Sequence, residues 1–70
     1  MTIIEITQEP VELFKLLKFE SILSSGGEAK HVISEGYVLV NDQVETRKRK
    51  KISSGDTIEF NGEKYTVRLV

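Results

Sequence analysis

Residues 24–42 read SSGGEAKHVISEGYVLVND, and their hydrophobic period changes halfway through the stretch. Ser25 and Glu28 have the spacing of a helix capping box, and Gly36 suits a left-handed helix end. After this glycine, residues 37–40 alternate as a strand does and run into an Asn-Asp turn. The stretch therefore predicts a helix between Ser25 and Gly36, followed directly by a strand.

A strand and another helix are predicted on the N-terminal side of this stretch. The β-branched residues Ile3, Ile4 and Ile6 favour a short strand. Thr7 is a candidate N-cap, and Pro10 suits the first turn of a helix that runs on to Lys18. The residues expected on the buried sides of the two helices are Leu13, Phe14, Leu17, Ala29, Val32 and Ile33.

Short strands and tight turns are predicted on the C-terminal side. Residues 57–60 and 63–70 flank an Asn-Gly pair, the strongest hairpin signal in the chain. Val44 can return as a short strand, and Ile52 is an expected core anchor. Phe14, Phe19 and Phe60 are expected in the core, and Tyr37 is expected to be half-buried. The fold class is therefore α+β, with two amphipathic helices packed on one face of a small, mostly antiparallel sheet of four to five short strands.

The composition excludes several classes of protein. Seventy residues suffice for one small domain, here residues 1–70, and the chain has no cysteine and one histidine. Neither a metal site nor a cofactor site is expected, and no nucleophile–base–acid set suggests an enzyme. No apolar run approaches the roughly 20 residues of a membrane span, so we expect a cytoplasmic protein without a membrane role. A monomer is expected, although exposed sheet edges offer a route to dimers.

Charge is concentrated at one place in the chain. Arg47, Lys48, Arg49, Lys50 and Lys51 are consecutive and carry +5, which leaves −6 on the other 65 residues. Five adjacent cations repel one another unless a polyanion or counterions neutralise them, and guanidinium and ammonium groups both bind phosphate. The run predicts an exposed loop that binds nucleic acid. The alternative is a solvated loop between strands.

Further candidates for phosphate contacts lie on the two predicted helices. Lys15, Lys18 and Lys30 project from the sides that are not buried, where they either contact phosphate or only confer solubility. His31 is either a surface polar residue or a contact to a base or phosphate. Around Ser25 and Gly27 the free N–H groups of a helix start could seat a phosphate, or the residues could serve only as a cap.

An ordered set of short motifs resembles the alpha-L RNA-binding domain, which is named after the fourth small-subunit ribosomal protein. The resemblance begins at Leu13 and Leu17 and ends at Gly55-Asp56, a core motif of about residues 13–56. Between these ends the matching motifs are Ser-Gly-Gly-x-Ala-Lys at 25–30, Gly-x-Val-x-Val-Asn at 36–41 and Val-Glu-x-Arg-Lys-Arg at 44–49. The motifs at 25–30 and 44–49 resemble those of small stand-alone bacterial members of the family.

The resemblance implies a non-catalytic module that docks on the phosphates of structured RNA, ribosomal RNA or tRNA above all. The RNA-binding face that it implies comprises Lys15, Gly27, Lys30, His31 and the run from Arg47 to Lys51. Lys30 stands where the wider family often has Arg, and Asp42 where it usually has Gly. Two rival readings remain open. In one, the basic loop grips an acidic protein partner, such as a ribosomal or replication protein. In the other, the chain is an accessory subunit that delivers RNA to a modifying enzyme.

Overall fold

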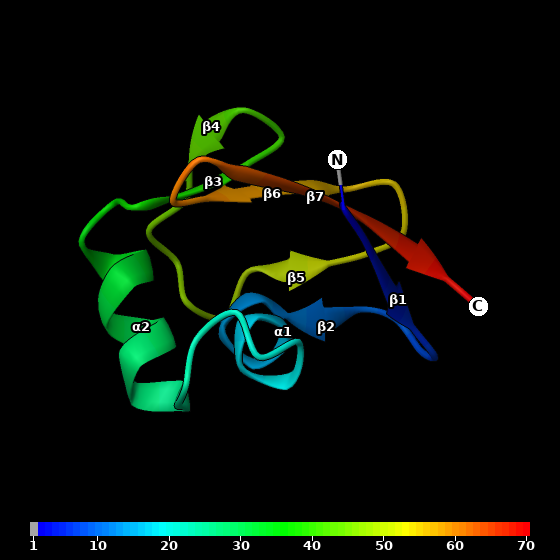
Figure 1. Cartoon of the computed structure of the whole chain (residues 1–70), viewed down its shortest axis with the longest axis horizontal. Coiled ribbons are helices and arrows are strands. Elements are labelled where there is room, and N and C mark those ends of the chain that lie inside the picture. Colours follow the sequence, from blue (N-terminus) through cyan, green and yellow to red (C-terminus); the bar gives the residue numbers. More distant parts are fainter. Residues whose placement is uncertain (1) are drawn as a thin grey trace.

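Two helices lie on one face of a five-stranded sheet in the computed structural model of the protein, which describes residues 2–70 (Figure 1). The elements in chain order are β1 (Thr2–Ile6), β2 (Val11–Glu12), α1 (Leu13–Phe19), α2 (Gly26–Ser34), β3 (Val38–Val40), β4 (Gln43–Val44), β5 (Lys51–Ile52), β6 (Thr57–Phe60) and β7 (Glu63–Leu69). The predicted α+β class is confirmed.

At one edge of the main sheet, the first and last strands of the chain pair with each other. Its order is β1-β7-β6-β3-β4, and β1 pairs with β7 in parallel whereas the other neighbours are antiparallel. The short strands β2 and β5 form a separate antiparallel pair. A mostly antiparallel sheet was expected, and the parallel β1–β7 pair is its only parallel pairing among residues 2–70.

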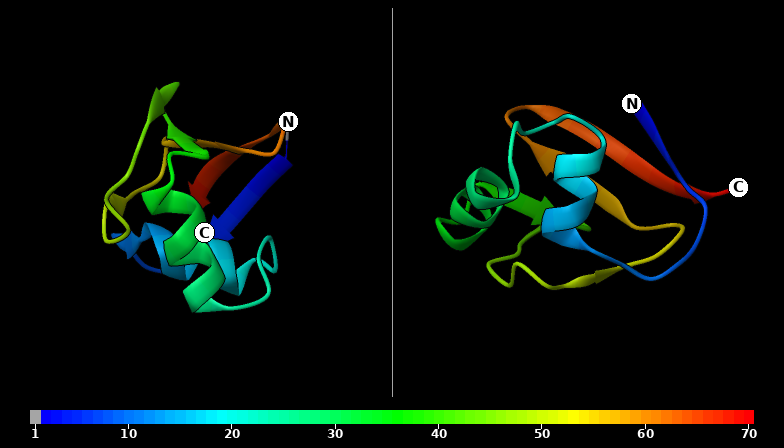
Figure 2. Two further views of the ribbon diagram at one scale, coloured as in Figure 1. Left: turned by 90° about the vertical axis from the view of Figure 1, so that its left-hand side faces the viewer. Right: turned by 90° about the horizontal axis from the view of Figure 1, so that it is seen from below.

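The core lies between the sheet and the helices, which occupy the same side of it (Figure 2). Thirteen apolar side chains are buried there: Ile4, Ile6, Leu13, Phe14, Leu16, Leu17, Ala29, Ile33, Val38, Val40, Ile52, Ile58 and Val67. On β3, the alternate residues Val38 and Val40 point inward, which is the two-residue period of a half-buried strand. The buried set includes Ile52, the expected anchor after the basic run.

Two tight turns that begin with Asn connect neighbouring strands of the sheet, β3 to β4 and β6 to β7. Asn61 and Gly62 both have positive φ, as do Asn41 and Asp42, which matches the tight hairpin turns that the sequence predicts. The Asn41 side chain also donates to the Asp56 carboxylate and accepts from the Thr57 N–H. Asn41 therefore joins the end of β3 to the start of β6.

Of the two hydrogen bonds of the predicted capping box at the start of α2, only the one accepted by Ser25 forms. The Ser25 hydroxyl accepts from the Glu28 N–H at 3.1 Å, as expected of an N-cap. The Glu28 carboxylate, however, accepts from the N–H and hydroxyl of Ser24 rather than from Ser25. Gly36, with φ of +84°, ends the helix as predicted.

The start of α1 differs from the prediction. Thr7 does not cap it and Pro10 does not lie in it, because Val11 and Glu12 extend as β2 to pair with β5. The first N–H groups of the helix are satisfied by a distant part of the chain. Leu13 N–H donates to the Lys50 carbonyl at 2.9 Å, and Phe14 N–H donates to the Lys48 carbonyl at 3.1 Å. A local cap is therefore unnecessary.

Two aromatic residues are more exposed than predicted. Phe19 was expected in the core but is 66% exposed, because α1 ends there and the chain turns away at Ser21, which has positive φ. Tyr37 was expected to be half-buried but is 60% exposed, since it precedes β3 on the outward side of Val38. Phe60 is partly buried against the core.

Candidate nucleic-acid interface

The basic run, residues 47–51, lies against the N-terminal end of α1. It is held there by its main chain, because the Lys48 and Lys50 carbonyls accept the first N–H groups of the helix. The side chains of Arg47, Lys48, Arg49 and Lys51 are exposed, and that of Lys50 is half-buried. The backbone therefore fixes the run in place while most of its charges face solvent.

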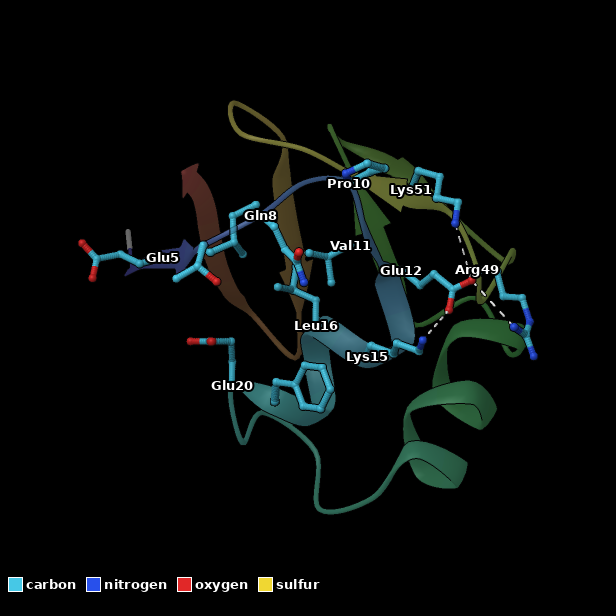
Figure 3. A pocket seen from close by; sticks show the side chains of 13 residues that line it. Glu5, Gln8, Pro10, Val11, Glu12, Lys15, Leu16, Glu20, Arg49 and Lys51 are labelled. Carbon is cyan, nitrogen blue, oxygen red and sulfur yellow. Dashed lines mark ion pairs between the residues drawn. The ribbon is translucent and has the colours of Figure 1, made fainter. Parts of the chain in front are cut away.

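Glu12 gathers three cations from separate parts of the sequence (Figure 3). Its carboxylate lies 3.3 Å from Lys15 Nζ, 3.6 Å from Lys51 Nζ and 3.7 Å from an Arg49 guanidinium nitrogen. The Glu12 side chain is only 15% exposed, whereas each of its cationic partners is at least half exposed. One sheltered carboxylate thus holds three cations whose outer sides remain accessible to a ligand.

The Phe14 ring is a second meeting point of cations. Lys30 Nζ lies 4.6 Å from the ring centroid, the Arg49 guanidinium carbon 5.7 Å and Lys15 Nζ 5.9 Å. These distances are in the range of cation–π attraction, which offsets part of the repulsion among like charges. Phe14 therefore joins a lysine of α2 to the cations around Glu12. We call Lys15, Lys30, Arg49 and Lys51 the cation cluster.

The remaining predicted site residues lie around this cluster or beside it. The Lys18 side chain lies beside the start of α2, because a Cβ added at Gly26 would be 3.8 Å from the Lys18 Cδ. Gly27 is exposed, with nothing within 4 Å of an added Cβ, so the first turn of α2 is open. Ser25 is that helix's N-cap, and His31 is exposed on the same helix.

Arg47 is held by a different carboxylate. Its guanidinium contacts both oxygens of Glu45, at 2.8 and 3.1 Å, and its N–H donates to the same side chain. Asp42, the acid in the β3–β4 turn, is ion-paired with Lys64 at 3.1 Å. The turn's negative charge is therefore partly neutralised within the sheet.

Two of these carboxylates have shifted titration. Burial acts to raise the pKa of Glu12, but the contact and charge of Lys15 and the charges of Lys51 and Arg49 outweigh it, so this pKa lies below its usual value of 4.5. The Arg47 hydrogen bond likewise holds the pKa of Glu45 below its usual value. Both groups are therefore anionic near neutral pH, and their neighbouring cations stay paired.

The lowered pKa of Glu12 predicts a pH-dependent cost of removing its charge. A carboxyl group whose pKa is lower in the folded state than in the unfolded state stabilises the fold when the pH is above its unfolded-state pKa. This stabilisation is lost as the pH falls below about 4.5 and then through the folded-state pKa. Glu12→Gln should therefore lower the unfolding temperature at pH 7, where it leaves three cations unpaired. At pH 3 the difference from the unaltered protein should be smaller, because a larger fraction of Glu12 is protonated there than at pH 7.

Thermal unfolding at the two pH values measures this effect, with the exposed Glu20→Gln as a matched control. An equal loss for Glu12→Gln at both pH values would show that the side chain acts through packing rather than charge.

Sequence reasoning missed two central members of this site, Glu12 and the Phe14 ring. The sequence pattern assigned no role in the site to Glu12, and it placed Phe14 only in the core. The spacing of three between Glu12 and Lys15 is a local signal for their ion pair. The approach of Arg49 and Lys51 has no such signal, because it depends on the pairing of β2 with β5.

Residues 2–70 hold no group of three or more His, Cys, Asp or Glu residues arranged to bind a metal ion. None of the helices in that part of the chain has the length and apolar character needed to cross a membrane.

Known proteins with similar sequences cover most of the chain. YbcJ of Escherichia coli (strain K12), whose name assigns it provisionally to RNA binding, is 51% identical over 60 residues, which are 86% of this chain and 83% of that protein. RlbA of Bacillus subtilis (strain 168), whose name assigns it provisionally to ribosome maturation, is 41% identical over 59 residues, 84% of this chain and 83% of that protein. Neither name is that of an enzyme.

A solved structure shares the fold. The solution structure of E. coli YbcJ, described as revealing an AlfaL motif involved in RNA binding, superposes with a TM-score of 0.73 at 45% sequence identity. The match covers 97% of this chain and 87% of that one. The S4 domain family matches residues 4–68, which is nearly the whole length. The chain therefore belongs to the S4 domain family, and the resemblance inferred from its motifs is confirmed.

Proposed function

We propose that this protein is a non-catalytic module, formed by residues 1–70, that binds structured RNA through its cation cluster and basic run. The observation that carries the proposal is the convergence of cations from α1, α2 and residues 47–51 around Glu12 and Phe14. A duplex RNA offers phosphates at regular spacing and little readable sequence, so a preformed group of cations selects it by shape and charge.

Each predicted site residue has a place in this proposal. Lys15, Lys30, Arg49 and Lys51 form the central contact, and Arg47, Lys48 and Lys50 extend it along the basic run. Lys18 and His31 widen it along the helices. At the open first turn of α2, the free N–H groups near Ser25 and Gly27 complement phosphate oxygens. The residues outside the basic run carry a net charge of −6, which disfavours RNA binding elsewhere on the surface.

The relatives favour the ribosome as the source of the RNA. One of them is named for RNA binding and another for ribosome maturation. We therefore propose that the RNA is ribosomal and that the protein acts in the cytoplasm on ribosomal particles. We further propose that it does so as a monomer.

Crosslinking in bacterial cells, followed by sequencing of the bound RNA, tests this proposal. The matched control replaces Arg47, Lys48, Arg49, Lys50 and Lys51 with Ser. We expect this variant to fold, because the run is held by main-chain carbonyls and Lys15 remains beside Glu12. Enrichment of ribosomal RNA that is lost in the variant would support the proposal. Equal recovery of RNA with both proteins would contradict it and favour an acidic protein partner.

A further inference from the structure

A groove lies beside α1, between that helix and the segment that joins β1 to β2 (Figure 3). Its volume is about 660 Å³. Lys15, Arg49 and Lys51 line it, so it shares three residues with the cation cluster. Val11, Leu16 and Phe19 also line it, and these three have no part in the contacts proposed above.

Charge is distributed unevenly along this groove. Figure 3 shows Lys15, Arg49 and Lys51 gathered at one end with Glu12, and Glu5 and Glu20 at the other. Glu12 is already ion-paired with the three cations, so the first end keeps a net positive charge. A phosphate is therefore attracted to the cationic end and repelled from the acidic one, which gives a nucleotide a preferred direction in the groove.

The middle of the groove has both apolar and polar groups, and an aromatic ring is exposed in the lining. Figure 3 shows Val11 and Leu16 there with the side-chain amide of Gln8, whereas Pro10 lies nearer to Lys51. Phe19, also in the lining, is 66% exposed, the highest exposure among the large apolar side chains of residues 2–70. A phenyl ring left in water loses the benefit of burial, but its face can stack on a nucleobase.

We propose that the groove receives one unpaired nucleotide of the bound RNA. Its phosphate lies at the end formed by Lys15, Arg49 and Lys51, and its base packs over Leu16 and stacks on Phe19. A base within a duplex is paired and stacked and cannot enter, so the occupant comes from a bulge, loop or end. This inference rests on the proposed RNA binding and names the kind of RNA that the protein prefers.

Binding to two hairpins tests the inference. The two hairpins have the same base pairs. One contains an additional, bulged 2-aminopurine, and the other is fully paired. Base–aromatic stacking contributes about 1–3 kcal/mol per base, so the unaltered protein should bind the bulged hairpin about 5- to 150-fold more tightly. The fluorescence of the bulged base should change on binding as it leaves the hairpin and stacks on the ring.

Three substitutions identify the role of the ring. Phe19→Ala should lose the preference for the bulge while keeping its affinity for the paired hairpin, and Phe19→Trp should restore the preference. Tyr37→Ala is the matched control, because it removes an aromatic ring that is 60% exposed and outside the groove lining. This control should behave like the unaltered protein. Both positions are exposed, so the variants should unfold at nearly the same temperature.

The outcomes separate this inference from the proposed function. Equal binding of both hairpins, with the Ser-substituted loop variant still impaired, would overturn the inference and leave RNA binding intact. A Phe19→Ala variant that keeps the bulge preference would also overturn it. If neither hairpin binds more tightly to the unaltered protein than to the loop variant, the proposed function itself fails.

Discussion

A fourfold rise in salt concentration is expected to weaken the binding of duplex RNA about 500-fold through the cations of residues 47–51 alone. If the five cations of residues 47–51 each neutralise one phosphate, the slope of log affinity against log salt is about −4.5, using the coefficient for duplex DNA. The exposed side chains of Arg47, Lys48, Arg49 and Lys51 can each reach solvent-facing phosphates without rearrangement of the main chain. Titrations of one fully paired hairpin at several salt concentrations measure the slope.

Arginine substitutions give this salt prediction its internal control. Arg47→Ala and Arg49→Ala should each weaken binding and reduce the magnitude of the slope by about 1, because each removes one phosphate contact. The unfolding temperature should change little, since surface ion pairs such as Arg47–Glu45 contribute about 0–1 kcal/mol. A slope near zero would rule out the electrostatic mechanism. A fall in stability that matches the loss of binding would indicate a structural loop.

Replacing Ile33 with Ala is expected to bring the protein close to unfolding. Ile33 is fully buried on α2, in the core between the helix and the sheet. Truncating such a side chain removes transfer energy and leaves a cavity, at a cost of about 2–5 kcal/mol. A domain of this size has only about 4–10 kcal/mol of total stability, at 0.05–0.15 kcal/mol per residue. The unfolding temperature should fall by about 8–40 °C.

Calorimetry or circular dichroism measures that fall. Val44→Ala is the matched control, because Val44 is also β-branched but is 60% exposed on an edge strand. Its effect should stay within about 0.5 kcal/mol. Similar losses for the two variants would mean that the core assigned to α2 does not carry the stability of the fold.

The parts of the fold that were predictable are those with local signals. The Ser25 cap, the positive-φ glycine at 36 and the Asn-Gly turn at 61–62 each act within a few residues, and each lies where expected. The order of the elements followed from the same patterns. The family resemblance implied a basic face, whose role in RNA binding stays a prediction.

The parts that were not predictable depend on contacts between distant residues. The start of α1 was misplaced because Val11 and Glu12 pair with a strand about 40 residues later, and Pro10 was read as if its surroundings were helical. Phe19 was assigned to the core from its apolar character, but the helix ends before a partner element can cover it. The meeting of cations at Glu12 follows from that same distant pairing.

Leu13 and Phe14 donate hydrogen bonds to the Lys50 and Lys48 carbonyls, so α1 depends on the main chain of the basic run and not on its side chains. Main-chain carbonyls are present whatever the side chains are, so the chemistry of residues 47–51 can vary without uncapping α1. An inserted or deleted residue would instead move both acceptors out of register and leave the helix start unsatisfied. Amide hydrogen exchange at Leu13 and Phe14 would report this directly. The run is thus tolerant of substitution and intolerant of changes in length, which suits it to being retuned for a different ligand by point mutation.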